Sequence, residues 1–142
     1  LDLSLAAKNS RANQTLNTPS LVNLLLIADQ AEWMLEEGGL AAMEARTRES
    51  SGVLYRWAEA SDFAEPFAHP GARSNLVVTI DLDASVPSEA LRGHLRANGI
   101  VDVDPYRSLV RNQIRVGTFR NVPAEDVAAL TACIDYVAER MV

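Results

Sequence analysis

The order of the helices and strands predicted from the spacing of apolar residues is the strongest constraint on the fold of this chain. Two long helices come first, over residues 19–36 and 40–61. After them the spacing predicts, in order, a strand over 76–82, a helix over 86–98, strands over 100–103 and 113–119, and a helix that begins at Pro123. This order indicates an α+β domain, in which a small, mostly antiparallel sheet has helices packed on one side.

The first long helix has a clear start signal and a very apolar surface. Thr18 is its predicted N-cap and Pro19 its first helical residue, where the missing N–H is no loss. All but one of residues 21–28 are apolar, so we expect this helix to be buried, within the chain or against a partner. Residues 1–16 show no clear period, and an entry strand or loop is expected there.

The later elements each show an apolar face. The residues expected to point inward are Leu40, Met43, Thr47, Ser50, Leu54, Trp57 and Ala58 in the second helix, Ala90, Leu91 and Leu95 in the third, and Val127, Leu130, Ile134, Val137 and Met141 in the last. Cys133 lies among this last group and is expected to be a buried apolar residue rather than a reactive thiol. Residues 62–74 are predicted as a loop, and the strand over 76–82 is expected to be buried on both faces at its start.

Composition limits the classes of function. The formal net charge of −6 argues against a nucleic-acid partner, which would need a basic face. The longest apolar run, Leu24 to Ala28, is far shorter than a membrane span, so no membrane contact and a cytoplasmic location are expected. One cysteine and two distant histidines give no metal-ligand spacing, and no metal site is predicted.

A cluster of arginines stands out against the acidic background. Arg107, Arg111, Arg115 and Arg120 fall within 14 residues, which suggests a small anion rather than a polyanion as the ligand. In the strand over 113–119, Ile114 and Val116 face one way, while Gln113, Arg115, Gly117 and Phe119 face the other.

An arginine inside a strand needs an anion if it is buried, and Gly117 leaves room on the same face. Arg107 and Arg115 together would suit a molecule with two anionic ends. The alternative, that both arginines pair with acids of this chain, remains open at this stage.

The motifs in their order resemble a known family. They are Asn17-Thr18-Pro19, Gly38-Gly39-Leu40 with Met43-Glu44, Ala72-Arg73-Ser74, Pro105-Tyr106-Arg107, Ile114-Arg115-Val116 and the last helix. From about Asn13 to Met141 the chain resembles the C-terminal part of phosphoserine aminotransferases of the actinobacterial type. The resemblance implies a homodimeric enzyme of the aspartate aminotransferase fold, that is, fold type I. Such an enzyme depends on pyridoxal phosphate and exchanges an amino group between glutamate and 3-phosphohydroxypyruvate in serine biosynthesis.

The resemblance also implies roles for individual residues. Asn17 and Thr18 match the pair that hydrogen-bonds the cofactor phosphate of the other subunit, and a helix N-terminus is physically suited to this. Arg115 matches the arginine that holds the substrate α-carboxylate. Arg107 matches the arginine that binds the substrate phosphate or the side-chain carboxylate of glutamate. Tyr106, which stands where many members have histidine, and Arg111 are expected to contact the phosphate.

The chain lacks parts that the reaction needs. Its one lysine, Lys8, lies outside the context of the lysine that forms the Schiff base in the family, so no catalytic residue is assigned. We expect residues 1–16 to be an entry segment from a missing cofactor domain and residues 17–142 to be the C-terminal small domain with its long connecting helices. The segment alone is expected to be inactive and not to retain the cofactor. A related step of vitamin B6 (pyridoxine) biosynthesis stays open for the parent.

The sequence is also compatible with two other functions. The chain could be a non-catalytic module that binds a small anion or forms a dimer, which the apolar helix after Pro19 would favour. It could also belong to another pyridoxal-phosphate family such as the cysteine desulfurases. That hypothesis is less favoured, because Cys133 is predicted in a helix rather than in an exposed loop.

Overall fold

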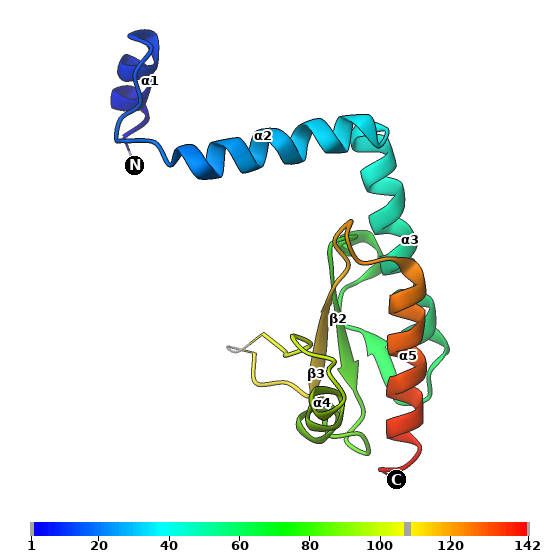
Figure 1. Ribbon diagram of the computed structural model, residues 1–142. Coiled ribbons are helices and arrows are strands. Elements are labelled where there is room, and N and C mark those ends of the chain that lie inside the picture. The colour runs from blue at the N-terminus through cyan, green and yellow to red at the C-terminus, as the bar shows by residue number, and fades with distance from the viewer. Residues whose placement is uncertain (1, 107–108, 142) are drawn as a thin grey trace. The chain divides into compact units, whose positions relative to one another are not determined.

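The computed structural model describes residues 2–106 and 109–141 (Figure 1). The chain divides into two compact units, Leu1–Leu40 and Ala41–Val142. The predicted boundary between residues 16 and 17 stays a prediction. None of the helices in the described ranges is long and apolar enough to cross a membrane.

The first unit is helical from near its start. Helix α1 spans Leu3–Arg11, so the expected entry strand or loop is wrong. Asp2 acts as its N-cap, with Oδ1 accepting hydrogen bonds from the backbone N–H groups of Ser4 at 2.9 Å and Leu5 at 3.1 Å. The apolar pattern did not predict this helix. Because α1 has no buried residue, its sequence needs no apolar stripe.

Helix α2 spans Leu21–Glu36, and Ser20 rather than Thr18 is its N-cap. The prediction that Pro19 opens the helix is therefore wrong by two residues. Threonine and serine are both good N-caps, so the sequence offered two candidates that local preference alone does not separate. Helix α2 is not buried within this chain, since it has no buried residue and Leu25 is 71% exposed, and its burial against a partner stays a prediction.

The second unit holds the sheet. Helix α3, Gly39–Ala60, begins at the last residues of the first unit and leads into strand β1, Ala64–Pro66. There follow a short 3-10 helix over Pro70–Ala72, strand β2 over Val77–Leu82, helix α4 over Ser88–Ala97, strand β3 over Gln113–Gly117 and helix α5 over Ala124–Ala138. The strands form one antiparallel sheet in the order β1-β2-β3. The α+β prediction is confirmed, although β1 lies where only a loop was expected.

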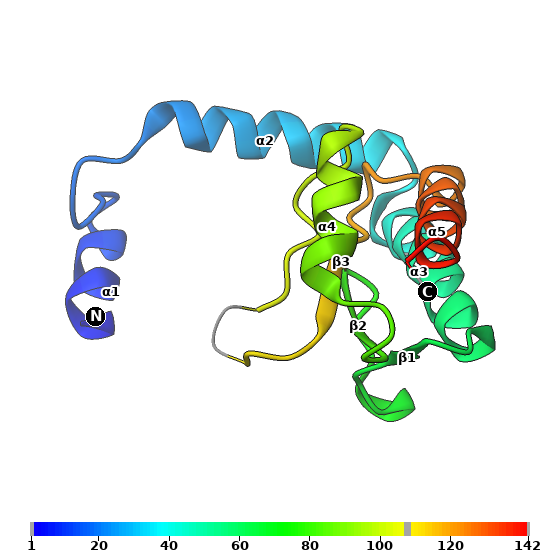
Figure 2. The same ribbon diagram turned by 90° about the horizontal axis from the view of Figure 1, so that it is seen from below.

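One face of the sheet carries the core. Val78, Ile80 and Leu82 alternate along β2 with less buried residues, so the expectation of a strand start buried on both faces is wrong. Ile114 and Val116 of β3 point to the same core. Helices α3 and α5 lie side by side against this face (Figures 1 and 2). They are joined by the Trp57 Nε1–H, which donates to Asp135 Oδ1 at 2.8 Å.

Several expected core residues lie elsewhere. Leu40 is 84% exposed, and Ala90 is exposed as well. Cys133 is an exposed free thiol, so its predicted burial is wrong. The buried residues of α5 are Val127, Thr131, Ile134 and Ala138. This stripe recurs every three or four residues, and Cys133 falls beside it.

The expected strand over 100–103 is not a regular strand. Residues 100–106 have no assigned secondary structure, and Asp102 has a positive φ of 62°. The segment still lies along the edge of β3, because the backbone N–H of Arg115 donates to the carbonyl oxygen of Val103 at 3.2 Å. This contact brings the segment before the arginine loop next to the arginine strand.

Candidate functional site

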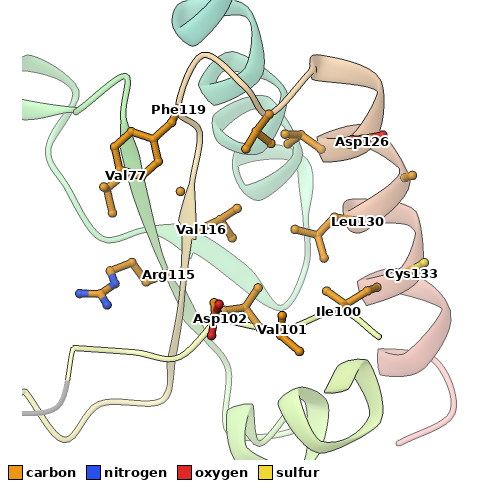
Figure 3. Close-up of a pocket in the computed structure, with 15 residues that line it drawn as sticks. Val77, Ile100, Val101, Asp102, Arg115, Val116, Phe119, Asp126, Leu130 and Cys133 are labelled. Carbon is orange, nitrogen blue, oxygen red and sulfur yellow. The ribbon is translucent and has the colours of Figure 1, made fainter. Parts of the chain in front are cut away.

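A groove of about 680 Å³ runs along the edge of β3 in the second unit (Figure 3). Its volume is within the usual range for small-molecule sites. Segment 100–103, β3 and α5 form its walls, and the lining is mainly apolar. Arg115 is the one basic residue among the lining residues that the structure describes, and Asp102 and Asp126 are the acidic ones.

Arg115 projects from the face of the sheet that is not packed on the helices. Its Cα partner in the register is Thr79 of β2. Figure 3 shows Arg115 and Leu130 on opposite sides of β3, so the guanidinium lies at the mouth of the groove and not against α5. The predicted division of the strand into two faces is confirmed, because Ile114 and Val116 are buried in the core on the other side.

The guanidinium of Arg115 has an aromatic neighbour. Its Cζ atom lies 5.7 Å from the centroid of the Tyr106 ring, a cation–π distance. Within the described ranges no acid forms an ion pair with Arg115. The structure thus brings Tyr106 and Arg115 together, and it leaves the charged group of Arg115 able to meet an anion.

The space beside Gly117 is not open to a ligand as expected. A Cβ atom added at Gly117 would lie 3.1 and 3.2 Å from ring carbons of Phe119. The Phe119 ring occupies the space that the absent side chain of Gly117 leaves. Gly117 therefore allows Phe119 to fold back over the strand, and the ring becomes part of the groove lining.

Arg111 has a carboxylate partner within the chain. Its Nε donates to Asp81 Oδ1 at 3.1 Å and its Nη2 donates to Oδ2 at 2.8 Å. The hydrogen bond to Asp81 and its charge raise the pKa of Arg111 above the usual value. The guanidinium also lies 5.3 Å from the centroid of Phe67. Arg111 thus has an acid partner within the chain, and a contact with phosphate would have to replace this pair.

Asn17 and Thr18 lie in the first unit, ahead of α2, and both are exposed. Their side chains form no hydrogen bond within the described ranges, although the backbone oxygen of Asn17 accepts one from Thr15 Oγ1 at 2.6 Å. Arg107 lies outside the described residues, so its predicted role is neither supported nor contradicted.

Sequence reasoning gave no role to two polar residues on the face of Arg115. Gln113 is fully buried and its Nε2 donates to Asp81 Oδ1 at 2.6 Å. An acid in the middle of an apolar strand, as Asp81 is, was the one signal that could have drawn attention to this network. Among the residues described, no cluster of three or more histidines, cysteines or acids is placed to bind a metal ion.

Comparison with known proteins identifies relatives along almost the whole chain. No family model matches. Over 142 residues the chain is 53% identical to a protein of Mycolicibacterium vanbaalenii that is provisionally named a phosphoserine aminotransferase, and 48% identical to the phosphoserine aminotransferase of Rhodococcus jostii. These alignments cover 99% of this chain but only 38% of each relative.

Solved structures agree on the fold. The phosphoserine aminotransferase of Bacillus circulans subsp. alkalophilus matches 92% of this chain and 36% of its own, with a TM-score of 0.83 and 20% identity. The pyridoxal-phosphate-bound enzyme of Trichomonas vaginalis matches with a TM-score of 0.78 and 19% identity, over 89% of this chain and 36% of its own. The resemblance expected from the sequence is thus confirmed, and the chain corresponds over nearly its whole length to a segment of phosphoserine aminotransferases.

Proposed function

We propose that the protein to which this chain belongs transfers an amino group between glutamate and 3-phosphohydroxypyruvate in the cytoplasm, as part of serine biosynthesis. This chain would be its C-terminal segment. The observation that carries the proposal is the position of Arg115, at the mouth of an apolar groove and without an ion-pair partner among the described residues. The relatives that are 48% to 53% identical support the same reaction.

Arg115 binds the α-carboxylate in this proposal. A guanidinium offers two parallel N–H groups that match a carboxylate, and the low polarity of the groove strengthens such a pair. Every amino acid and keto acid in the reaction carries this carboxylate, so one residue serves both half-reactions. Tyr106 packs against the Arg115 guanidinium, with Cζ 5.7 Å from the ring centroid.

The phosphate end of the substrate requires a second cation. Arg107 is proposed for it, with Tyr106 as a neutral hydrogen-bond donor. Arg111 is proposed to hold the intervening loop on the sheet through Asp81.

Asn17 and Thr18 fit a role in binding the cofactor phosphate. The amide and the hydroxyl have donors without partners in the described part of the chain, and the free N–H groups at the start of α2 favour an anion. Pyridoxal phosphate, when bound, supplies the electron sink for the carbanion at Cα. Lys8 lies exposed in α1, so the Schiff-base lysine is proposed to lie outside these residues.

A homodimer is part of the proposal. Helix α2 exposes a set of large apolar side chains, namely Leu21, Val22, Leu24, Leu25, Leu26, Ile27 and Leu35. An apolar helix surface of this kind is typical of a subunit interface.

Steady-state kinetics of the complete protein test the role of Arg115. Arg115→Ala should lower kcat/KM about 10- to 100-fold for glutamate and for phosphoserine alike, because a charge-assisted hydrogen-bond pair is lost in both half-reactions. Arg140→Ala is the matched control, since this arginine stacks on Tyr136 beyond the end of α5. Loss of activity toward only one of the two substrates would contradict the assignment.

The non-catalytic alternative makes a different prediction. A binding module needs no cofactor, so the purified protein would show no absorbance band of a Schiff base and would still bind a small dianion. The band together with transaminase activity would exclude this alternative.

A further inference from the structure

The side-chain amide of Gln113 is fully buried on the sheet face that carries Arg115. Asp81 lies directly opposite Gln113 on β2 and accepts a hydrogen bond from Gln113 Nε2 at 2.6 Å. A carboxylate only accepts hydrogen bonds, so the amide must present its NH₂ group to Asp81. The amide oxygen Oε1 therefore points away from Asp81.

Arg111 makes this orientation permanent. Its two hydrogen bonds, to Oδ1 at 3.1 Å and to Oδ2 at 2.8 Å, hold the Asp81 carboxylate in position. A flipped amide would place its oxygen against that carboxylate, and the repulsion excludes the flip. The network thus controls the direction of a buried acceptor that neither Asp81 nor Arg111 uses.

Gln113 Oε1 is the single buried side-chain polar atom in the described ranges without a hydrogen-bond partner. A buried amide oxygen without a donor destabilises a protein and is uncommon in folded chains. Such an atom can accept a hydrogen bond from a donor that reaches it.

Arg115 is a cationic donor on the same face, and unlike Arg111 it has no acid partner among the described residues. It lies two residues beyond Gln113, and its register partner Thr79 lies two residues before Asp81. A guanidinium has five N–H groups, and a carboxylate bound by its two ends uses two of them. The other three N–H groups of Arg115 need acceptors, and an acceptor in the protein would fix the orientation of the guanidinium toward the carboxylate.

We infer that Gln113 is a positioning residue of the carboxylate site, whose Oε1 accepts an N–H of Arg115 when Arg115 binds a substrate carboxylate. This inference rests on the proposed role of Arg115. The Arg115 guanidinium lies 5.7 Å from the centroid of the Tyr106 ring. Because the amide is fixed before the ligand arrives, the bound orientation of Arg115 costs little further ordering.

The test uses the complete, cofactor-loaded protein and glutarate, a dicarboxylate that has no amino group to transfer. Calorimetry gives the dissociation constant of glutarate, kinetics give KM and kcat for glutamate, and a thermal melt without ligand gives stability. Gln113→Met removes the amide and keeps an unbranched side chain. Thr79→Val, a change at the register partner of Arg115, is the control for general disturbance of this face.

Gln113→Met should weaken glutarate binding and raise KM for glutamate by about 10- to 100-fold, as expected for one hydrogen bond to a charged group. The value of kcat should change little, because the carboxylate is held equally throughout the reaction. The melting temperature should not fall by more than a few degrees, since the amide removed includes an oxygen without a partner. Thr79→Val should leave the affinity for glutarate near that of the unmodified protein.

The outcomes separate this inference from the proposed function. If Arg115→Ala abolishes glutarate binding and Gln113→Met does not change it, the positioning role is wrong and the proposed function stands. If Arg115→Ala binds glutarate as tightly as the unmodified protein, both are wrong. Should Gln113→Met fail to fold, Gln113→Asn replaces it under the same measurements, because its shorter side chain cannot reach Asp81 and Arg115 together.

Discussion

Asn112 joins three parts of the second unit, and replacing it with alanine should destabilise the fold strongly. Its Oδ1 accepts a hydrogen bond from the backbone N–H of Ser88 at 2.7 Å. Its Nδ2 donates to the carbonyl oxygens of Leu82 at 2.9 Å, Asp83 at 2.9 Å and Val86 at 3.2 Å. Helix α4 has Pro87 at its N-cap and no local side-chain cap, so a residue 24 positions later supplies one.

The magnitude follows from what Asn112→Ala would leave without a partner. Loss of a helix cap costs about 1 kcal/mol. The carbonyl groups of Leu82 and Val86 belong to buried residues, and each lost hydrogen bond there costs about 0.5 to 1 kcal/mol. The bond to Asp83 lies in an exposed position and adds little. The total is about 2 to 3 kcal/mol of unfolding free energy.

Urea unfolding of this chain measures the change. The sequence has two tryptophans, so a Trp33→Phe background leaves Trp57 as the single fluorescence reporter, and Trp57 packs on the core of the second unit. With a denaturant slope of about 1.5 kcal/mol per molar, the midpoint should fall by roughly 1.3 to 2 M. The matched control is Asn98→Ala, which loses one exposed hydrogen bond to the carbonyl of His94.

Two results would refute this reasoning. A midpoint for Asn112→Ala within about 0.3 M of the Asn98→Ala control would show that the shared hydrogen bonds contribute little to stability. Asn112→Asp keeps the acceptor for Ser88 but loses all three donated bonds and brings a negative charge toward carbonyl oxygens. If this variant were as stable as the unmodified chain, the donated bonds would not matter.

Two further outcomes are expected. Ile134→Ala should cost about 3 to 4 kcal/mol in the same unfolding assay, because the side chain is fully buried between α5 and the sheet, and Ala132→Gly on the exposed side is the control for helix propensity. Burial raises the pKa of Tyr55 above its usual value of 10.0, more than Arg73 and the bond to Ser74 lower it. The folded state then holds this proton more tightly, so the stability it adds is complete below pH 10 and is lost as pH rises through the folded pKa. Tyr55→Phe should flatten the alkaline fall in melting temperature, and an unchanged slope would show that Tyr55 does not cause it.

The functional site was only partly visible in the sequence. The alternation of the strand correctly separated Arg115 from Ile114 and Val116, because side chains on a strand alternate strictly. The pairing of Arg111 with Asp81 was not visible, since the two residues are 30 positions apart and meet only after β2 and β3 are in register. The same register buries Gln113, which the local pattern does not predict because glutamine is a polar residue.

Local patterns determined most of the helices and the two longer strands, β2 and β3. Helix α4 ends as predicted before Gly99, whose φ of 85° suits a residue without a Cβ atom. Leu54, Leu91 and Ile134 are buried as expected, because an apolar stripe at helical spacing has to face a core. These features depend on residues within a few positions of one another, and the sequence contains that information directly.

Contacts between distant residues decided the rest. The short strand β1 exists because Ala64–Pro66 pairs with β2, and nothing in its own composition predicts a strand. The cap of α4 comes from Asn112, the space over Gly117 is filled by Phe119, and the apolar surface of α2 stays exposed in this chain. In each case the free energy depends on which group lies opposite, so the sequence alone established most of the helices and their apolar faces, whereas only the tertiary structure decided their partners.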